Sequence, residues 1–187
     1  MSGEPGARYD LPVPEGRRER VEAALLAALE ALGLARREAA AGQWRWVALG
    51  LVSALQGALV AALSGYETAE VEAVLNPSQA DRIAPVALLL RRARSQDYLN
   101  PPEQVELSGS RQRALERVLT IRNSAVHALS VELHDTFGRD ALAVLDLIRH
   151  LVVDAPAFLP RQHRVVAALI RDEAAALERT LETFKPA

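Results

Sequence analysis

The stretch that decides the fold is residues 43–64, QWRWVALGLVSALQGALVAALS, and no charged residue occurs between Arg45 and Glu67. Its run of leucine, valine and alanine predicts one long helix, nearly long enough to cross a bilayer. A membrane span would leave Ser53 and Gln56 in hydrocarbon, and the chain has no second segment of this kind. We therefore expect a central helix that its neighbours bury on most sides, with a membrane span as the alternative.

Three polar residues share one face of this apolar helix. Arg45, Ser53 and Gln56 fall within about 80° of each other on a helical wheel. One interpretation is a hydrogen-bonded core glutamine together with an arginine at the helix end, and the other is a polar seam that lines a site. The small residues of the same helix, Gly50 and Gly57 among them, predict that neighbouring helices approach closely.

The composition of the chain excludes several classes of protein. Of its 187 residues 50% are hydrophobic, which suits one domain with a sizeable core. Because there is no cysteine, disulfide scaffolds, thiolate zinc sites and cysteine nucleophiles are excluded. The net charge of -2 excludes a globally basic nucleic-acid coat, so any contact with nucleic acid must come from local patches.

The chain outside this helix predicts an all-α, up-and-down bundle of about five principal helices plus a short helix. No strand pattern and no internal repeat stands out. Residues 1–15 contain three prolines and no apolar core, so we expect a flexible N-terminal arm of a cytoplasmic protein rather than a secretion signal. Residues 16–187 then form a single domain. The helices are expected at about residues 15–41, 43–64, 68–75, 78–94, 110–133, 139–154 and 161–183, with a surface loop at 97–109.

The segment 110–133 carries the strongest signal for a site. Arg122 falls inside its apolar stripe, where steps of three and four residues favour a leucine. A guanidinium keeps its charge, so we expect an anionic or polar partner for Arg122. The stripe consists of Leu115, Val118, Leu119, Val126, Leu129 and Leu133.

A polar strip runs along one edge of that stripe. Within it Asn123 and His127 lie one turn apart. Arg122 emerges about 140° from His127, but its long side chain reaches the same cleft, particularly one completed by another helix or subunit. His127 and His134 are about 10 Å apart along the axis, which is too far to chelate one metal ion. The strip consists of Glu116, Thr120, Asn123, His127, Ser130 and His134.

Residues 121–127, IRNSAVH, resemble the HEPN superfamily (higher eukaryotes and prokaryotes nucleotide-binding domain). That superfamily is marked by an arginine, four to six residues and then a histidine, with a polar residue often right after the arginine. Arg122, Asn123 and His127 fit this pattern, and an all-α domain of this size fits the context. In relatives an aromatic residue often follows the histidine, whereas Ala128 follows it here.

A second likeness lies nearer the N-terminus. The motif WRW at residues 44–46, followed by SALQGA at residues 53–58, is similar to a group of bacterial helical proteins with a later Arg-Asn…His. Together the two resemblances cover most of the chain, from about residue 17 to residue 155.

The resemblance implies a function as well as a fold. HEPN proteins are commonly dimers that place two Arg/His motifs at a shared cleft, and active members are metal-independent endoribonucleases. It implies RNA cleavage through the ribose 2′-OH, without metal or cofactor, in a toxin–antitoxin or antiphage defence setting. His127 would be the general acid/base, Arg122 would neutralise the phosphorane charge, and Asn123 would orient the histidine or hold the phosphate.

Further residues complete the expected site. Gln56, Arg117 and Ser130 are the predicted substrate-binding residues, and local arginines supply positive charge for RNA. These arginines are Arg91, Arg92 and Arg94 on one helix and Arg111, Arg113 and Arg117 near the motif. We interpret Asp146, Arg149 and His150 as a solvated face.

Two other interpretations stay open. In the first, Arg122 is salt-bridged and His127 is an ordinary surface histidine. In the second, the protein is a non-enzymatic, dimeric HEPN-like module that binds a nucleotide, a cognate antitoxin or another partner protein. There Arg122 would be a buried structural arginine paired with an acid or with Gln56.

Overall fold

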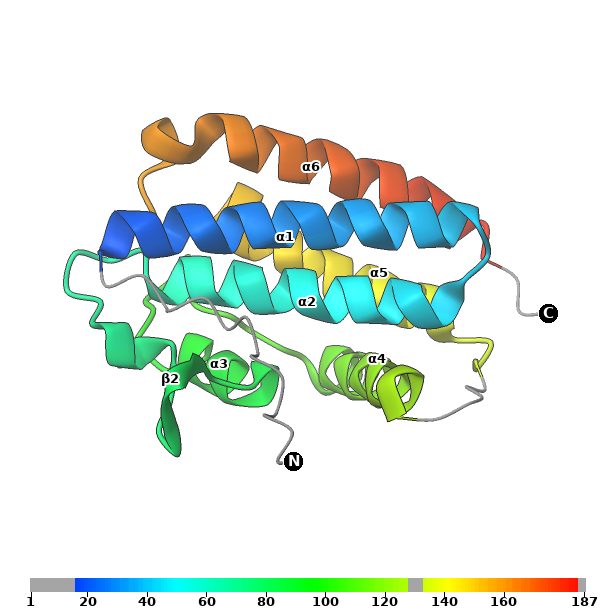
Figure 1. Ribbon diagram of the computed structural model, residues 1–187, viewed down its shortest axis with the longest axis horizontal. Helices are drawn as coiled ribbons and strands as arrows, with labels where there is room; N and C mark the ends of the chain where they lie inside the picture. Colours follow the sequence, from blue (N-terminus) through cyan, green and yellow to red (C-terminus); the bar gives the residue numbers. More distant parts are fainter. Residues whose placement is uncertain (1–15, 128–132, 185–187) are drawn as a thin grey trace, which may run out of the picture.

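The fold is an all-α helical bundle, seen in a computed structural model that describes residues 16–127 and 133–184 (Figure 1). The predicted fold class is therefore confirmed, whereas the predicted arm at 1–15 lies outside the described residues. In the described part the α-helices are α1 (Arg17–Ala40), α2 (Trp44–Leu63), α3 (Val86–Ala93), α4 (Gly109–His127), α5 (Phe137–Arg149) and α6 (Pro160–Glu182).

Helix α2 is the centre of the bundle. Fourteen of its twenty residues are buried, and it packs against α1, α3, α4 and α5. Figure 1 shows it between α1 and α6 on one side and α3 and α4 on the other. It is the one helix of the described part long and apolar enough to cross a membrane, yet 78% of its apolar window is buried inside the protein. The prediction of a buried central helix is confirmed, and this burial is consistent with a soluble protein.

Close packing of α1 on α2 depends on two glycines. A Cβ atom at Gly50 would lie 2.8 Å from the carbonyl oxygen of Ala31, and one at Gly57 would lie 2.7 Å from that of Ala24. Both distances are below van der Waals contact with backbone atoms that cannot move aside locally. The small residues therefore bring the two helices together as the sequence predicts.

The helices predicted at 68–75 and 78–94 are wrong over most of their lengths. Val71–Ala73 forms only a single 3₁₀ turn, and an antiparallel pair of strands follows, β1 (Leu75–Asn76) and β2 (Gln79–Ile83). The expectation of no strand is thus also wrong. Within the turn the Asn76 side chain accepts a hydrogen bond from the Ser78 backbone N–H at 3.1 Å, which competes with helix formation.

Helix α3 begins only after Pro85, because a proline restricts the residue before it and donates no backbone hydrogen bond. Arg92 of α3 is buried and donates from Nη1 to the carbonyl oxygens of Ala73 at 3.1 Å and Leu75 at 2.9 Å. This arginine therefore holds the hairpin against α3, and it is not part of an exposed positive patch as the sequence suggested.

Three aromatic rings hold one end of the bundle together. Trp44, Phe137 and Phe184 pack edge to face, with ring centroids 4.8 to 6.3 Å apart. They join the start of α2, the start of α5 and the residues just after α6. Trp44 is thus a packing residue, and the start of α5 is held against the start of α2.

Candidate functional site

Helix α4 presents a different buried face from the one predicted. The predicted stripe is wrong at Val126, whose exposed fraction is 49%, and Leu119 is only half-buried. Leu133 lies beyond the helix, and Leu129 lies outside the described residues. The apolar pattern misled because alanine and isoleucine fill the same face one position earlier. The buried residues of α4 are Ala114, Leu115, Val118, Ile121 and Ala125.

Arg122 lies at the edge of this buried face and is half-buried. Its Nη1 donates a hydrogen bond to Oδ1 of Asn123 at 3.0 Å, so the expected polar partner is an amide. Its Nε is buried and has no hydrogen-bond partner within the described part of the chain. Gln56 does not pair with it: the Gln56 Nε2 donates to the carbonyl oxygen of Ala84 at 3.2 Å. That glutamine holds Ala84, two residues before α3, which agrees with the interpretation as a hydrogen-bonded core glutamine.

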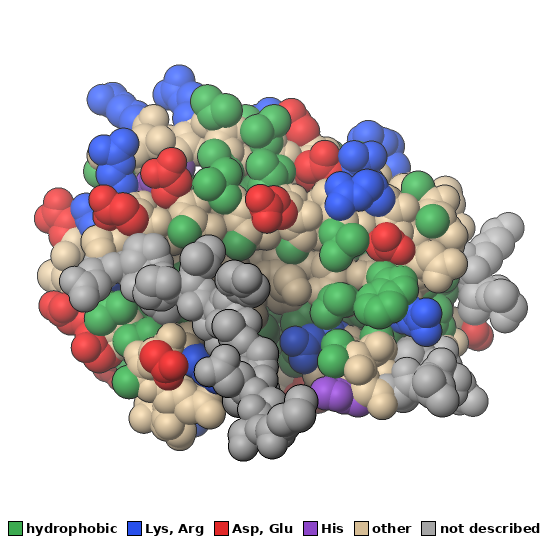
Figure 2. All heavy atoms as spheres, viewed as in Figure 1, with side chains coloured by type: hydrophobic (Ala, Val, Ile, Leu, Met, Phe, Trp, Pro, Cys, Tyr) green, Lys and Arg blue, Asp and Glu red, His purple; other side chains and the backbone are tan. Residues whose placement is uncertain are grey.

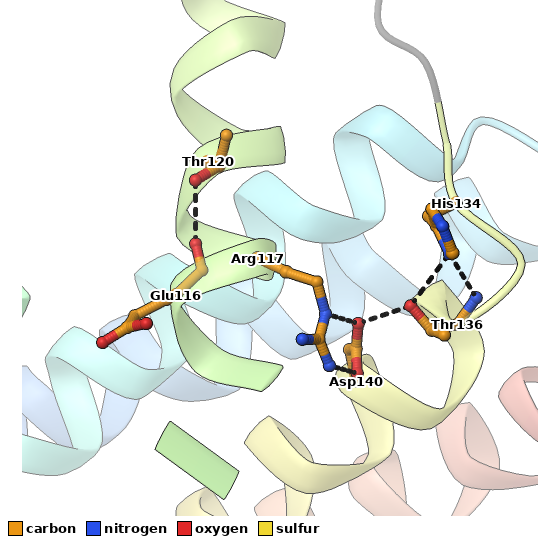
Figure 3. Close-up of polar contacts among 6 residues, drawn as sticks. All are labelled: Glu116, Arg117, Thr120, His134, Thr136 and Asp140. Atoms are coloured by element: carbon orange, nitrogen blue, oxygen red, sulfur yellow. Dashed lines mark hydrogen bonds and ion pairs between the residues drawn. The ribbon is translucent and has the colours of Figure 1, made fainter. Parts of the chain in front are cut away.

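Asn123 and His127 lie on the exposed side of α4, together with Glu116 and Thr120. Figure 3 shows Thr120 on this side donating back to the carbonyl oxygen of Glu116, at 2.9 Å. His127 forms no hydrogen bond or ion pair with any described residue. The structure therefore brings Arg122 and Asn123 into contact and leaves His127 one turn farther on, open to solvent.

The last two residues of the predicted polar strip are Ser130 and His134. Ser130 lies outside the described residues, as does Ala128. His134 precedes α5, where its Nδ1 accepts from the backbone N–H of Thr136 at 3.4 Å (Figure 3). His134 is thus part of the start of α5, and its inclusion in the strip on α4 was wrong.

Arg117 forms the strongest polar contact between α4 and α5. Its Nε and Nη2 each donate to one carboxylate oxygen of Asp140, both at 2.6 Å, and the Thr136 hydroxyl donates to the same carboxylate at 2.9 Å (Figure 3). Asp140 is 2% exposed, so this bidentate pair neutralises a buried charge. The hydrogen bonds to Asp140 raise the pKa of Arg117. The predicted substrate-binding arginine therefore already binds a carboxylate of its own chain.

A groove lies beside this ion pair, with a volume of about 390 Å³. Four of its lining residues are arginines and one is a carboxylate. We call it the arginine groove. It is lined by Ser110, Arg111, Arg113, Ala114, Arg117, Arg139, Asp140 and Ala143.

A second hollow of about 460 Å³ lies between α4, α5 and the loop at 101–107. Its lining includes Asp146, Arg149 and His150, of which Asp146 is exposed as expected, whereas Arg149 and His150 are half-buried. His150 begins a π-helical turn, His150–Asp154, and its Nε2 is buried without a hydrogen-bond partner in the described part. Such π-helical turns often occur at functional sites. The sequence pattern of this segment predicted an ordinary α-helix and did not indicate the turn. Arg111 and Ala143 line both hollows.

The described residues contain no group of three or more His, Asp or Glu side chains placed to hold one metal ion.

No protein-family model, no curated protein and no solved structure matches the chain. The site is therefore interpreted from its own geometry.

Proposed function

We propose that the protein is a HEPN-like, metal-independent endoribonuclease that acts as a homodimer in the cytoplasm, in a toxin–antitoxin or antiphage defence setting. One observation carries the proposal. The guanidinium of Arg122 reaches Asn123, and His127 lies one turn beyond, exposed on the same helix. The three motif residues thus lie on adjoining parts of α4, with the histidine open to an RNA strand.

The chemistry follows from the three side chains. His127 takes the proton from a ribose 2′-OH, and that oxygen attacks the neighbouring phosphorus. The bond from phosphorus to the 5′ oxygen breaks, leaving a 2′,3′-cyclic phosphate and a 5′-OH that takes a proton from the second copy's histidine. Arg122 stabilises the charge on the phosphorane oxygens because its guanidinium is always protonated. Asn123 accepts from Arg122 and so keeps the guanidinium at the edge of the exposed face.

A second copy is part of the proposal because one chain does not make both groups converge. Arg122 and His127 emerge about 140° apart on α4, so one phosphate reaches both more readily when two helices face each other. Val126 lies between them on the helix surface and is 49% exposed, which offers an apolar contact for that second copy.

The surface offers one competing position for a dimer. Figure 2 shows hydrophobic side chains gathered along the seam of α1 and α6, where Leu26, Val165 and Leu169 are 43%, 73% and 47% exposed. A dimer through that seam would keep the two α4 helices apart, since α4 lies on the other side of α2 (Figure 1). Light scattering on V126E and V165E separates the two: the proposal expects V126E to give monomers, and dissociation by V165E alone would contradict it.

The activity is tested with purified protein and total RNA in EDTA. We expect cleavage to fall by about 100-fold or more in Arg122→Ala and in His127→Ala, with the helical circular dichroism unchanged. Arg164→Ala and His134→Ala are the matched controls, since each removes the same side-chain type outside the motif, and both are expected to cleave like the wild type. Absence of cleavage in the wild type, or cleavage that survives both motif substitutions, would refute the nuclease proposal.

The second candidate is the non-enzymatic module that binds a nucleotide or a partner protein such as an antitoxin. It is favoured by the buried Nε of Arg122, which suits a structural arginine more than a freely mobile one. In that case Arg122→Ala lowers the melting temperature, His127→Ala has no effect, and RNA remains intact under all conditions.

A further inference from the structure

We infer that the arginine groove binds the phosphodiester backbone of a single RNA strand, which then runs along α4 toward His127. The identification of the polyanion as RNA rests on the proposed function, whereas the groove itself does not. The inference stands on the charge of the lining, the pairing of its one carboxylate and the positions of Arg113 and Arg117 on α4 relative to His127.

The charge of the groove is strongly positive once its carboxylate is accounted for. Both oxygens of Asp140 are occupied by Arg117, and one also accepts from Thr136. Asp140 therefore offsets Arg117 and no other residue. This leaves Arg111, Arg113 and Arg139 as the net charge of the lining.

These three arginines are exposed and largely uncommitted. Arg113 and Arg139 form no hydrogen bond or ion pair with the described residues. Arg111 approaches Asp146 at 3.7 Å, but both side chains are about half exposed, so this pair contributes little and water screens it. An anion that enters the groove thus gains new partners without breaking strong existing ones.

The lining favours phosphate over other anions. A guanidinium offers two parallel N–H donors that match two phosphate oxygens, and arginines on both sides of a groove fit a chain of phosphates. The groove also lies at the beginning of α4, where backbone N–H groups and the helix dipole add positive potential. Ser108 already accepts from the backbone N–H of Arg111 at 3.3 Å, so the arginine side chains remain the main contacts.

Two arginines of the arginine groove lie toward the same side of α4 as the histidine. On α4, Arg113 and Arg117 emerge within about 80° of His127, whereas Arg122 emerges on the other side. His127 follows Arg117 by ten positions, which is about 15 Å along the axis, a length that a few nucleotides span. A strand anchored at the groove therefore passes the exposed histidine.

The test uses the full chain carrying His127→Ala in EDTA, so that the RNA stays intact, and measures fluorescence anisotropy of a labelled single-stranded RNA. We expect Arg113→Gln with Arg139→Gln to weaken binding at least ten-fold. The slope of log K against log salt is expected to become shallower by about 1.4, since each lost phosphate contact changes it by about 0.7. The matched control is Arg161→Gln with Arg164→Gln, two exposed arginines on α6, which is expected to bind nearly as well as the parent.

Competitors identify the chemistry that is recognised. Single-stranded DNA of the same sequence is expected to bind comparably, because contacts to backbone phosphates carry no base information. Inorganic phosphate is expected to displace the RNA only at high concentration. If poly-glutamate of equal charge competes as well as RNA, or if inorganic phosphate binds while RNA does not, the inference is overturned.

Different results refute the inference about the arginine groove and the nuclease proposal. An unchanged salt slope in the groove variant, or equal losses in the groove and control variants, overturns the groove as the RNA site even when RNA is cleaved. Binding that depends on Arg113 and Arg139, together with intact RNA in the wild type, supports the groove and refutes only the nuclease proposal.

Discussion

Helices α2 and α4 are of nearly equal length, yet they differ strongly in how much of their surface is buried. Fourteen residues of α2 are buried, against five of α4. Helix α2 has neighbours on most sides and carries the core, whereas α4 has one narrow apolar face and one bidentate ion pair to α5. The difference explains why the candidate polar site lies on α4. Because neighbouring helices cover most sides of α2, few of its side chains can reach a ligand.

The largest expected effect comes from removing core volume in α2. Leu55 is completely buried, so Leu55→Ala leaves a cavity that is expected to cost about 3 kcal/mol. For a chain of this length we expect the melting temperature to fall by about 10 °C, measured by circular dichroism. A change of only a degree or two would contradict the central position of α2.

A smaller effect is expected from the ion pair that positions α4. Asp140→Asn removes the charge that Arg117 and Thr136 contact, and it is expected to lower the melting temperature by about 5 °C. The control is Asp172→Asn, because Asp172 pairs with Arg171 at the surface and both side chains are more than half exposed. Equal shifts in the two variants would show that α4 does not depend on Asp140.

The pH dependence of stability tests a buried group remote from α4. Burial lowers the pKa of His163 below 6.5, against the attraction of Glu22. The folded state thus favours the neutral ring, so stability is complete above pH 6.5 and is lost as the pH falls toward the lowered pKa. Melting curves at pH 7.5 and 5.0 are expected to show a smaller acid loss for His163→Gln than for the wild type. If the wild type and His163→Gln lose the same stability in acid, other titratable groups cause the pH dependence.

The smallest expected effect is that of Val126→Ala on the exposed side of α4. Because half of this side chain already contacts solvent, we expect the melting temperature to fall by less than about 2 °C. The difference between the melting-temperature losses of Val126→Ala and Leu55→Ala directly compares the burial of α4 with that of α2. A loss as large as that of Leu55→Ala would contradict the exposed position of Val126 on α4.

Much of the bundle was predictable from local patterns. The bounds of α1, α2 and α6 agree with the expected segments to within about two residues, because apolar periodicity and proline positions act over a few turns. The hairpin was missed because its strands are short and carry no alternation of apolar and polar residues. On α4 the stripe was assigned one position off, since alanine and valine both count as apolar in a pattern that does not measure burial.

The sequence by itself determined the helical class, the buried centre at α2 and the motif Arg122, Asn123 and His127 on one helix, because each depends on residues a few turns apart. Tertiary structure alone decided that Arg117 binds Asp140, that Arg92 holds a hairpin and that Arg111, Arg113 and Arg139 line one groove. Those outcomes depend on which helices pack together. An arginine in a sequence carries the same charge everywhere, and only its neighbours in space decide whether that charge is already paired or available to a ligand.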